Sequence, residues 1–293
     1  MKEDIRIAVL ETVEELKEVQ ELEHLVWGTG STPIQQTFTA AKNGGIVLGL
    51  YDQNVLAGFQ YSFPGFKDGQ VYLCSHLLGI HPEYRGKGYG LRLKLAQKEV
   101  AAAKGYDLIT WTYDPLESVN ANLNISKLGA FCRSYKVNCY GDLGGPLNHG
   151  LESDRFQVEW LPKSRHAVVP PVLDKKMMDR IPVTYGANGF PMLGCIDEEA
   201  IKSMIDAEDT IFVPIPAHFQ QVKRENMELA REWRLKTRFL FSLLFEEGYA
   251  VVETVRQPEA GMIYYVLMPQ TSLGLEPTVI AGKTVKQEKR VRV

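Results

Sequence analysis

Hydrophobic and polar positions in the first half of the chain change between the period of a strand and that of a helix. Thr12 and Glu15 form a capping box at the start of one helical pattern, and Asp52-Gln53-Asn54 separates two apolar runs as a hairpin turn would. In chain order the pattern predicts a strand (5–10), two helices (12–27 and 32–42), three strands (46–51, 55–63 and 71–80), a helix (89–104), a strand (107–112), a helix (118–127) and a strand (131–138).

The second half of the chain begins with a change in composition. Prolines gather at Pro162, Pro170 and Pro171, so we expect a link within 140–170 and two domains, 1–145 and 146–293. Later patterns predict strands at 156–160, 210–215, 250–255 and 262–268, with a helix or helix pair between 218 and 247.

One strand runs into a glycine-rich turn and then a helix. His81-Pro82 ends the strand, because proline cannot donate a ladder hydrogen bond, and Arg85-Gly86-Lys87-Gly88-Tyr89-Gly90 precedes the helical pattern. Such a turn directs backbone N–H groups and the positive end of a helix dipole at one point, and glycines let a bulky anion approach. The pattern therefore favours a pyrophosphate site, with an ordinary tight connection as the alternative.

Two motifs carry a family resemblance. R-x-x-G-x-G follows Leu78-Gly79-Ile80, and residues 120–131 read NANLNISKLGAF. Both resemble motifs of the GNAT acetyltransferase superfamily, and the predicted order of elements over about 4–140 is that of the GNAT fold. The segment WTYDPLESVNANLNISKLGA is also similar to a group of two-part bacterial GNAT-like proteins, which implies no substrate.

The resemblance implies an α+β fold of the α/β sandwich type, with a central mixed and mostly antiparallel sheet. The C-terminal α/β region repeats a strand, helix, Gly-Tyr, strand order, and Glu232 to Lys236 echoes Glu83 to Lys87. A degenerate second GNAT-like unit and coincidence both account for this repeat.

The resemblance further implies an acyltransferase that moves an acetyl or other short acyl group from acyl-CoA directly to the amine of a small molecule. Main-chain groups of the strand would bind the pantetheine arm, the turn would bind the pyrophosphate, and an Asn amide would hold the pantetheine amides. The expected binding residues are Leu78, Gly79, Ile80, Arg85, Gly86, Lys87, Gly88, Tyr89, Gly90, Asn120 and Asn124. For each Asn, a helix cap or an exposed polar position is an equal alternative.

His76 is the candidate general base. On a regular strand it shares a face with Leu78 and Ile80, and arylalkylamine acetyltransferases carry a histidine at the matching register. Imidazole titrates near neutral pH, which suits the task, although a hydrogen-bonded core histidine is the alternative. Many GNAT members place a tyrosine, the proton donor to the thiolate, where this chain has Ile125, so Tyr113 or water would have to replace it.

Composition narrows the class of protein. A hydrophobic content of 45% and a charged content of 24% are ordinary for a globular protein, and a net charge of −3 gives no general field for nucleic acid. Basic residues run together only in the tail, from Lys283 to Arg292. Four scattered cysteines, no metal-ligand spacing and no long apolar segment lead us to expect a cytoplasmic protein without a metal or a membrane partner.

Two rival functions stay open. Because Ile125 replaces the tyrosine, a non-catalytic acyl-CoA-binding or regulatory protein is the first alternative to an enzyme. In the other, the first half is structural and the partner surface lies in the second half. In the acyltransferase interpretation, the second half would contribute Arg231, Arg234 and Arg238, which share a helix face, to bind an acceptor carboxylate. The alternative is a solvated charged face on which they pair with Glu228 and Glu232.

Overall fold

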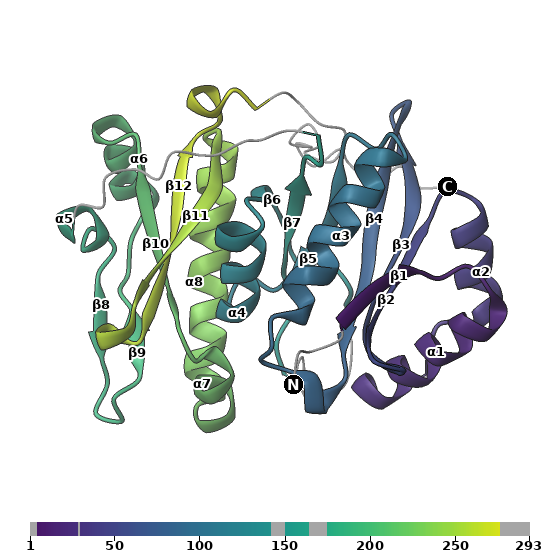
Figure 1. The fold of residues 1–293 in the computed structure, drawn as a ribbon. Coiled ribbons are helices and arrows are strands. Elements are labelled where there is room, and N and C mark those ends of the chain that lie inside the picture. The colour runs from purple at the N-terminus through teal and green to yellow at the C-terminus, as the bar shows by residue number, and fades with distance from the viewer. Residues whose placement is uncertain (1–4, 29, 142–149, 164–174, 276–293) are drawn as a thin grey trace, which may run out of the picture. The chain divides into compact units, whose positions relative to one another are not determined.

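The computed structural model describes residues 5–28, 30–141, 150–163 and 175–275 (Figure 1). The chain divides into two compact units, residues 1–111 with 159–165 and residues 112–158 with 166–293. Strands β5 (Ile109–Tyr113) and β7 (Arg155–Trp160) each have residues in both units. The expected domains 1–145 and 146–293 stay a prediction. Much of the expected link and the basic tail lie outside the described residues.

The first unit is built on four antiparallel strands and the start of a fifth. Its elements are β1 (Ile5–Val9), α1 (Val13–Trp27), α2 (Ile34–Lys42), β2 (Ile46–Asp52), β3 (Val55–Lys67), β4 (Gln70–Ile80), the 3-10 turn η1 (Pro82–Tyr84), α3 (Tyr89–Ala103) and β5. The strands lie in the order β1-β2-β3-β4-β5, antiparallel up to β4, and β5 is parallel to β4. Local sequence explains most of these bounds: the Thr12 and Glu15 capping box is present, and Gly28 ends α1 in the left-handed conformation.

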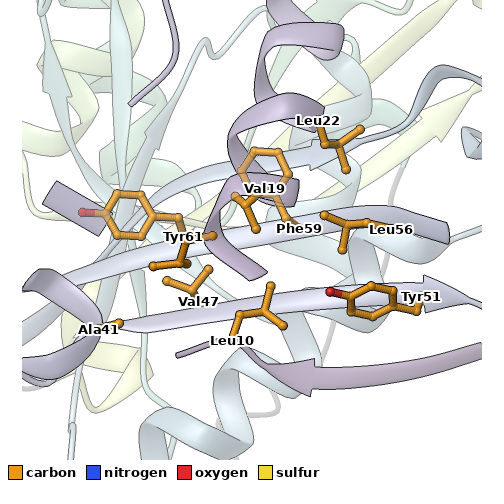
Figure 2. Close-up of a cluster of buried hydrophobic side chains, with 10 residues drawn as sticks. Leu10, Val19, Leu22, Ala41, Val47, Tyr51, Leu56, Phe59 and Tyr61 are labelled. Carbon is orange, nitrogen blue, oxygen red and sulfur yellow. The ribbon is translucent and has the colours of Figure 1, made fainter. Parts of the chain in front are cut away.

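Helices α1 and α2 cover one face of this sheet, where a hydrophobic cluster forms the core (Figure 2). Alternation along β3 sends Phe59 and Tyr61 into this cluster. On the opposite face of the sheet, which we call the α3 face, Gly58 lies against Leu93 of α3; the first face is called the α1/α2 face. The cluster consists of Leu10, Leu16, Val19, Leu22, Ala41, Val47, Tyr51, Leu56, Phe59 and Tyr61.

The inner face of α3 differs from a simple apolar stripe. Its buried residues are Tyr89, Leu93, Lys94, Gln97 and Ala101, which recur every three to four positions. Leu95, an apolar residue of the predicted helix, is instead exposed. A lysine and a glutamine therefore occupy positions where this helix meets the sheet.

The strands of the second unit lie in the order β7-β6-β11-β12-β10, and the β6–β11, β11–β12 and β12–β10 pairs are antiparallel. Its elements are α4 (Ser118–Ala121), the π-helical segment η2 (Asn122–Lys127), β6 (Phe131–Lys136), β7, α5 (Lys175–Met178), β8 (Val183–Tyr185), β9 (Pro191–Leu193), α6 (Glu198–Ala207), β10 (Ile211–Pro216), α7 (Phe219–Glu225), α8 (Met227–Glu246), β11 (Tyr249–Gln257), η3 (Pro258–Ala260), β12 (Met262–Pro269) and η4 (Gln270–Leu273). Asn226 separates α7 from α8 by capping α8, which explains the helix pair. The hairpin β8–β9 and helices α5 and α6 were not predicted.

The echo between Glu232–Lys236 and Glu83–Lys87 was wrong. The later segment lies inside helix α8, whereas the earlier one belongs to η1 and the turn before α3. In addition, β12 lies between β10 and β11, whereas β4 and β5 are direct neighbours. The repeated order of elements remains, and a degenerate second unit stays a prediction.

The predicted sheet is confirmed as mixed and mostly antiparallel, with helices against it. In the part of the chain that the structure describes, no helix is both long and apolar enough to cross a membrane.

Candidate functional site

The glycine-rich turn has the conformation that glycine makes easy. Gly86 and Gly88 adopt φ values of +81° and +78°, and a Cβ at either position would meet open space. Gly88 is the N-cap of α3, and Gly90 lies in the first turn of that helix beside Leu78. Glycine is thus required by backbone conformation at 86 and 88, and the space above both residues is left clear.

The turn offers hydrogen-bond donors and positive charge. The amides in the first turn of α3 have no intrahelical acceptor, and the main-chain hydrogen bonds within the described residues leave the amides of Gly86, Lys87 and Gly88 unused. Arg85, Lys87 and Arg92 are exposed around them. The helix dipole adds its positive end, so this turn can bind an anion such as a phosphate.

Strand β4 presents a free edge next to the turn. Among the described residues it pairs with β5 only at Leu73–Ile109 and Cys74–Thr110, so the two strands part at Ser75. On the other side, the amide of His81 donates to the carbonyl of Ala57 in β3 at 3.0 Å. Because main-chain groups of an antiparallel strand alternate in direction, those of Leu78 and Ile80 then point to the free edge. Arg85 Nε donates to the carbonyl of Ile80 at 3.4 Å, as this direction requires.

His76 lies at a β-bulge in β4. The register shifts between Tyr61–Leu77 and Ser62–Ser75, which leaves His76 as the extra residue. Its expected face was therefore wrong: Leu78 and Ile80 lie toward α3, whereas the His76 ring contacts Tyr61 and Phe63 on the α1/α2 face.

The side chain of His76 is exposed, although its ring contacts the rings of Tyr61 and Phe63. Partial burial lowers its pKa from the ordinary value, and the Glu23 carboxylate on α1 opposes this effect in part. A neutral imidazole at neutral pH can accept a proton, so the side chain has the protonation state that a general base needs. His81, by contrast, accepts the amide of Glu83 at 3.3 Å through Nδ1 and shapes the turn.

Other residues singled out from the sequence lie in the second unit. Asn120 is exposed on α4, and Asn124 is buried in η2, where its main-chain carbonyl accepts the amide of Ala130 at 3.1 Å. Their expected roles stay predictions. Ile125 is buried, and the Tyr113 hydroxyl donates to Tyr265 at 3.2 Å inside the second unit.

Of the three arginines of α8, Arg231 is exposed, whereas Arg234 and Arg238 form ion pairs within the second unit. Arg234 is 3% exposed and pairs with Asp114, whose other carboxylate oxygen accepts the amide of Leu116 at 2.9 Å. Arg238 pairs with Asp154 and Glu152. These contacts hold the second unit together internally, and only tertiary structure could show that the acids come from Asp114 and the start of β7.

Sequence reasoning missed a buried polar cluster beneath α3, which we call the Lys94 cluster (Gln60, Ser75, Lys94, Gln97, Trp111 and Trp160). Lys94 is 2% exposed, and its Nζ donates to Ser75 Oγ at 2.9 Å and lies 3.4 Å from the centre of the Trp111 ring. Ser75 Oγ in turn donates to Gln97 Oε1 at 3.3 Å. A helical wheel offered the missing signal, since Lys94 and Gln97 fall on the stripe of Leu93 and Ala101.

Burial lowers the pKa of Lys94 well below its ordinary value. An ammonium in this position lacks bulk water, and in the described part of the chain no carboxylate lies within ion-pair distance of it. The described residues also contain no group of three or more His, Cys, Asp or Glu side chains placed to hold a metal ion.

Comparison with known proteins assigns a family to this part of the chain. The model described as "Acetyltransferase (GNAT) family" matches residues 12–123, from α1 through the glycine-rich turn to η2. No curated protein matches the chain by sequence. Residues 12–123 therefore carry a domain of the GNAT acetyltransferase family, which confirms the family resemblance.

Solved structures with a similar fold cover about half of the chain. The ribosomal-protein-S18-alanine N-acetyltransferase from Escherichia coli is 14% identical and covers 55% of this chain and 95% of its own, with a TM-score of 0.45. The mosquito arylalkylamine N-acetyltransferase like 5b is 17% identical and covers 54% of this chain and 100% of its own, with a TM-score of 0.43. The PaiA N-acetyltransferase from Thermoplasma acidophilum, solved with coenzyme A, is 20% identical and covers 54% of this chain and 99% of its own, with a TM-score of 0.38.

Proposed function

We propose that the GNAT domain binds acyl-CoA and transfers an acetyl or other short acyl group directly to an amine of a small molecule. The glycine-rich turn takes the pyrophosphate, with Arg85 and Lys87 adding charge. The main-chain groups of Leu78 and Ile80 take the pantetheine arm. The observation that carries the proposal is the juxtaposition of a free strand edge with an anion-binding helix start, both within one unit.

The chemistry needs alignment, a polarised carbonyl and a base. A thioester chain extending from the turn along β4 toward Ser75 passes the amide of Leu78, which is a donor for the thioester oxygen. His76 removes the proton from the incoming ammonium, and the free amine attacks the thioester carbon. The bulge serves this role because it turns His76 out of the regular alternation and onto the α1/α2 face.

Replacing one glycine tests the site. Gly88→Glu places a carboxylate where the pyrophosphate would lie, so we expect acetyl-CoA affinity measured by calorimetry to fall at least about tenfold, or about 1.4 kcal/mol. The new side chain has open space, although its positive φ costs about 1–2 kcal/mol of stability.

Gly105→Glu is the matched control, since Gly105 also has a positive φ and open space but follows the other end of α3. It should keep the affinity of the original protein at a similar melting temperature. Equal affinity of the Gly88→Glu variant and the original protein would refute the placement of the pyrophosphate.

A non-catalytic acyl-CoA-binding protein is the second candidate, because a buried isoleucine, Ile125, stands at the position of the family's tyrosine. Release of CoA with a panel of arylalkylamines, polyamines and peptide amines separates the two functions. Tight binding of acetyl-CoA without release of CoA for any amine, and without any effect of His76→Ala, would favour the binding protein. A cytoplasmic location belongs to the same proposal.

A further inference from the structure

The Lys94 cluster lies where β4 and β5 part. The last paired residues are Cys74 and Thr110, and the next residue on each strand is Ser75 and Trp111. Lys94 Nζ contacts both of these, with 2.9 Å to Ser75 Oγ and 3.4 Å to the centre of the Trp111 ring. The amine of Lys94 thus lies, on the α3 side, at the point where the two strands part, between Ser75 and Trp111. We call this point the vertex.

Two buried amide atoms in the cluster lack hydrogen-bond partners. Gln60 Oε1 and Gln97 Nε2 belong to side chains that are fully buried, and neither atom has a partner among the described residues. Gln60 Nε2 and Gln97 Oε1 are both directed to Ser75 Oγ, so the unused atoms belong to the same group of side chains. Buried amides are normally satisfied, and their unused capacity points to a further polar group or water at this place.

We propose that Lys94 is the proton donor to the CoA thiolate. This inference rests on the proposed function, in which the thioester chain runs along the free edge of β4 from the turn at 85–90 toward the vertex. When the amine attacks, the carbon–sulfur bond breaks and its electron pair goes to sulfur. The sulfur takes a proton from Lys94 Nζ, which becomes a neutral amine and regains a proton from solvent after CoA leaves.

The surroundings of Lys94 suit a donor of this kind. Trp111 and Trp160, at 3.4 and 5.4 Å from Nζ, stabilise the ammonium through their ring faces but accept no proton. Burial lowers the pKa of Lys94, which makes its ammonium a stronger acid than that of an exposed lysine.

Lys98, Glu159 and His76 are titratable groups on the elements around Lys94. Lys98, one turn along α3, lies with its Nζ 5.2 Å from the centre of the Trp160 ring. Glu159 neighbours Trp160 on β7 and alternates to the other face, and His76 on β4 lies on the α1/α2 face. Lys94 is therefore the cation that contacts both Ser75 and Trp111 where the strands part.

The pKa of the thiol of bound CoA tests the role without knowledge of the acceptor. Ultraviolet absorbance of the thiolate is titrated for CoA bound to the original protein, to Lys94→Met and to the control Lys98→Met, with desulfo-CoA complexes as blanks. We expect the bound thiol in the original protein and in Lys98→Met to have a pKa at least about one unit below that in Lys94→Met, a tenfold change in acid dissociation. Desulfo-CoA should bind all three proteins equally.

An equal thiol pKa in Lys94→Met and the original protein, with CoA bound to both, would overturn the role of Lys94 alone. Failure of the original protein to bind CoA would instead overturn the proposed function and the inference with it. Lys94→Gln, measured in parallel, supplies a second neutral variant if Lys94→Met does not fold. Intact mass after incubation with acetyl-CoA adds one outcome: an acetyl group on Lys94 would show that it is an acceptor, and would refute its role as donor.

Discussion

Replacing Lys94 by methionine should stabilise the protein at neutral pH, and the gain should shrink as the pH rises. Lys94 is buried without a carboxylate partner in the described residues, and this burial lowers its pKa well below the ordinary value. In the unfolded chain the same group titrates near about 10.4. Folding at neutral pH therefore requires either burial of a charge or release of a proton, and methionine removes both requirements.

The magnitude follows from proton linkage. Between the native and unfolded pKa values the unfolded state binds about one more proton than the native state, so the stability of the original protein rises by about 1.4 kcal/mol per pH unit. Lys94→Met lacks this rise. The difference between the two proteins is largest below the native pKa of Lys94 and closes as the pH approaches about 10.4. Ser75 loses one donor in the variant but keeps its contacts with Gln60 and Gln97.

Urea unfolding at several pH values between about 7 and 9.5 measures this difference. Lys104→Met, at the exposed end of the same helix, is the control and should change stability by less than about 0.5 kcal/mol at every pH. Lys94→Met that is less stable than the original protein at pH 7, with a difference independent of pH, would refute the reasoning. Such a result would mean that the aromatic rings and Ser75 fully offset the cost of burying the ammonium, so that folding does not lower the pKa of Lys94.

Three other predictions concern separate parts of the molecule. His76→Ala should slow acyl transfer about 10²- to 10⁴-fold with unchanged CoA affinity. In the original protein the rate should fall on the acid side only below pH 6.5, because the lowered pKa keeps the His76 imidazole neutral down to that range. The same acid-side fall in His76→Ala would contradict the role of His76 as the base. Arg234→Met should destabilise the protein by up to about 3–5 kcal/mol in urea unfolding, since the largely buried Asp114 loses its close ion pair and keeps the longer contact with Arg155 at 3.8 Å. Adding Asp114→Asn should restore part of the loss. Thr12→Ala should lower the free energy of unfolding by about 1 kcal/mol, because it removes the N-cap of α1. The amides of Thr12 and Glu11 lower the pKa of Glu15, so part of the stability of α1 should be lost as the pH falls below about 4.5. Urea midpoints at two pH values measure both effects, and no loss of stability at either pH would rule out the cap.

Local sequence determined much of the first unit. The capping box at Thr12, the two-residue turn between β2 and β3, the end of β4 at His81-Pro82 and the glycines of the turn each act over a few residues, so their effect can be read without the rest of the chain. The geometry of the glycine-rich turn was predictable for the same reason. Its donors are main-chain groups, and their direction follows from a strand, a glycine-rich turn and a helix in succession.

Only tertiary structure decided the remainder of the site. The bulge that moves His76 to the α1/α2 face depends on the register of β4 against β3, which no local pattern contains. The Lys94 cluster assembles β3, β4, α3, β5 and the end of β7, and Arg234 meets an aspartate 120 residues away in sequence. Buried charges acquire their partners, and their pKa values, from packing between segments distant in sequence, so the chain order alone cannot specify them.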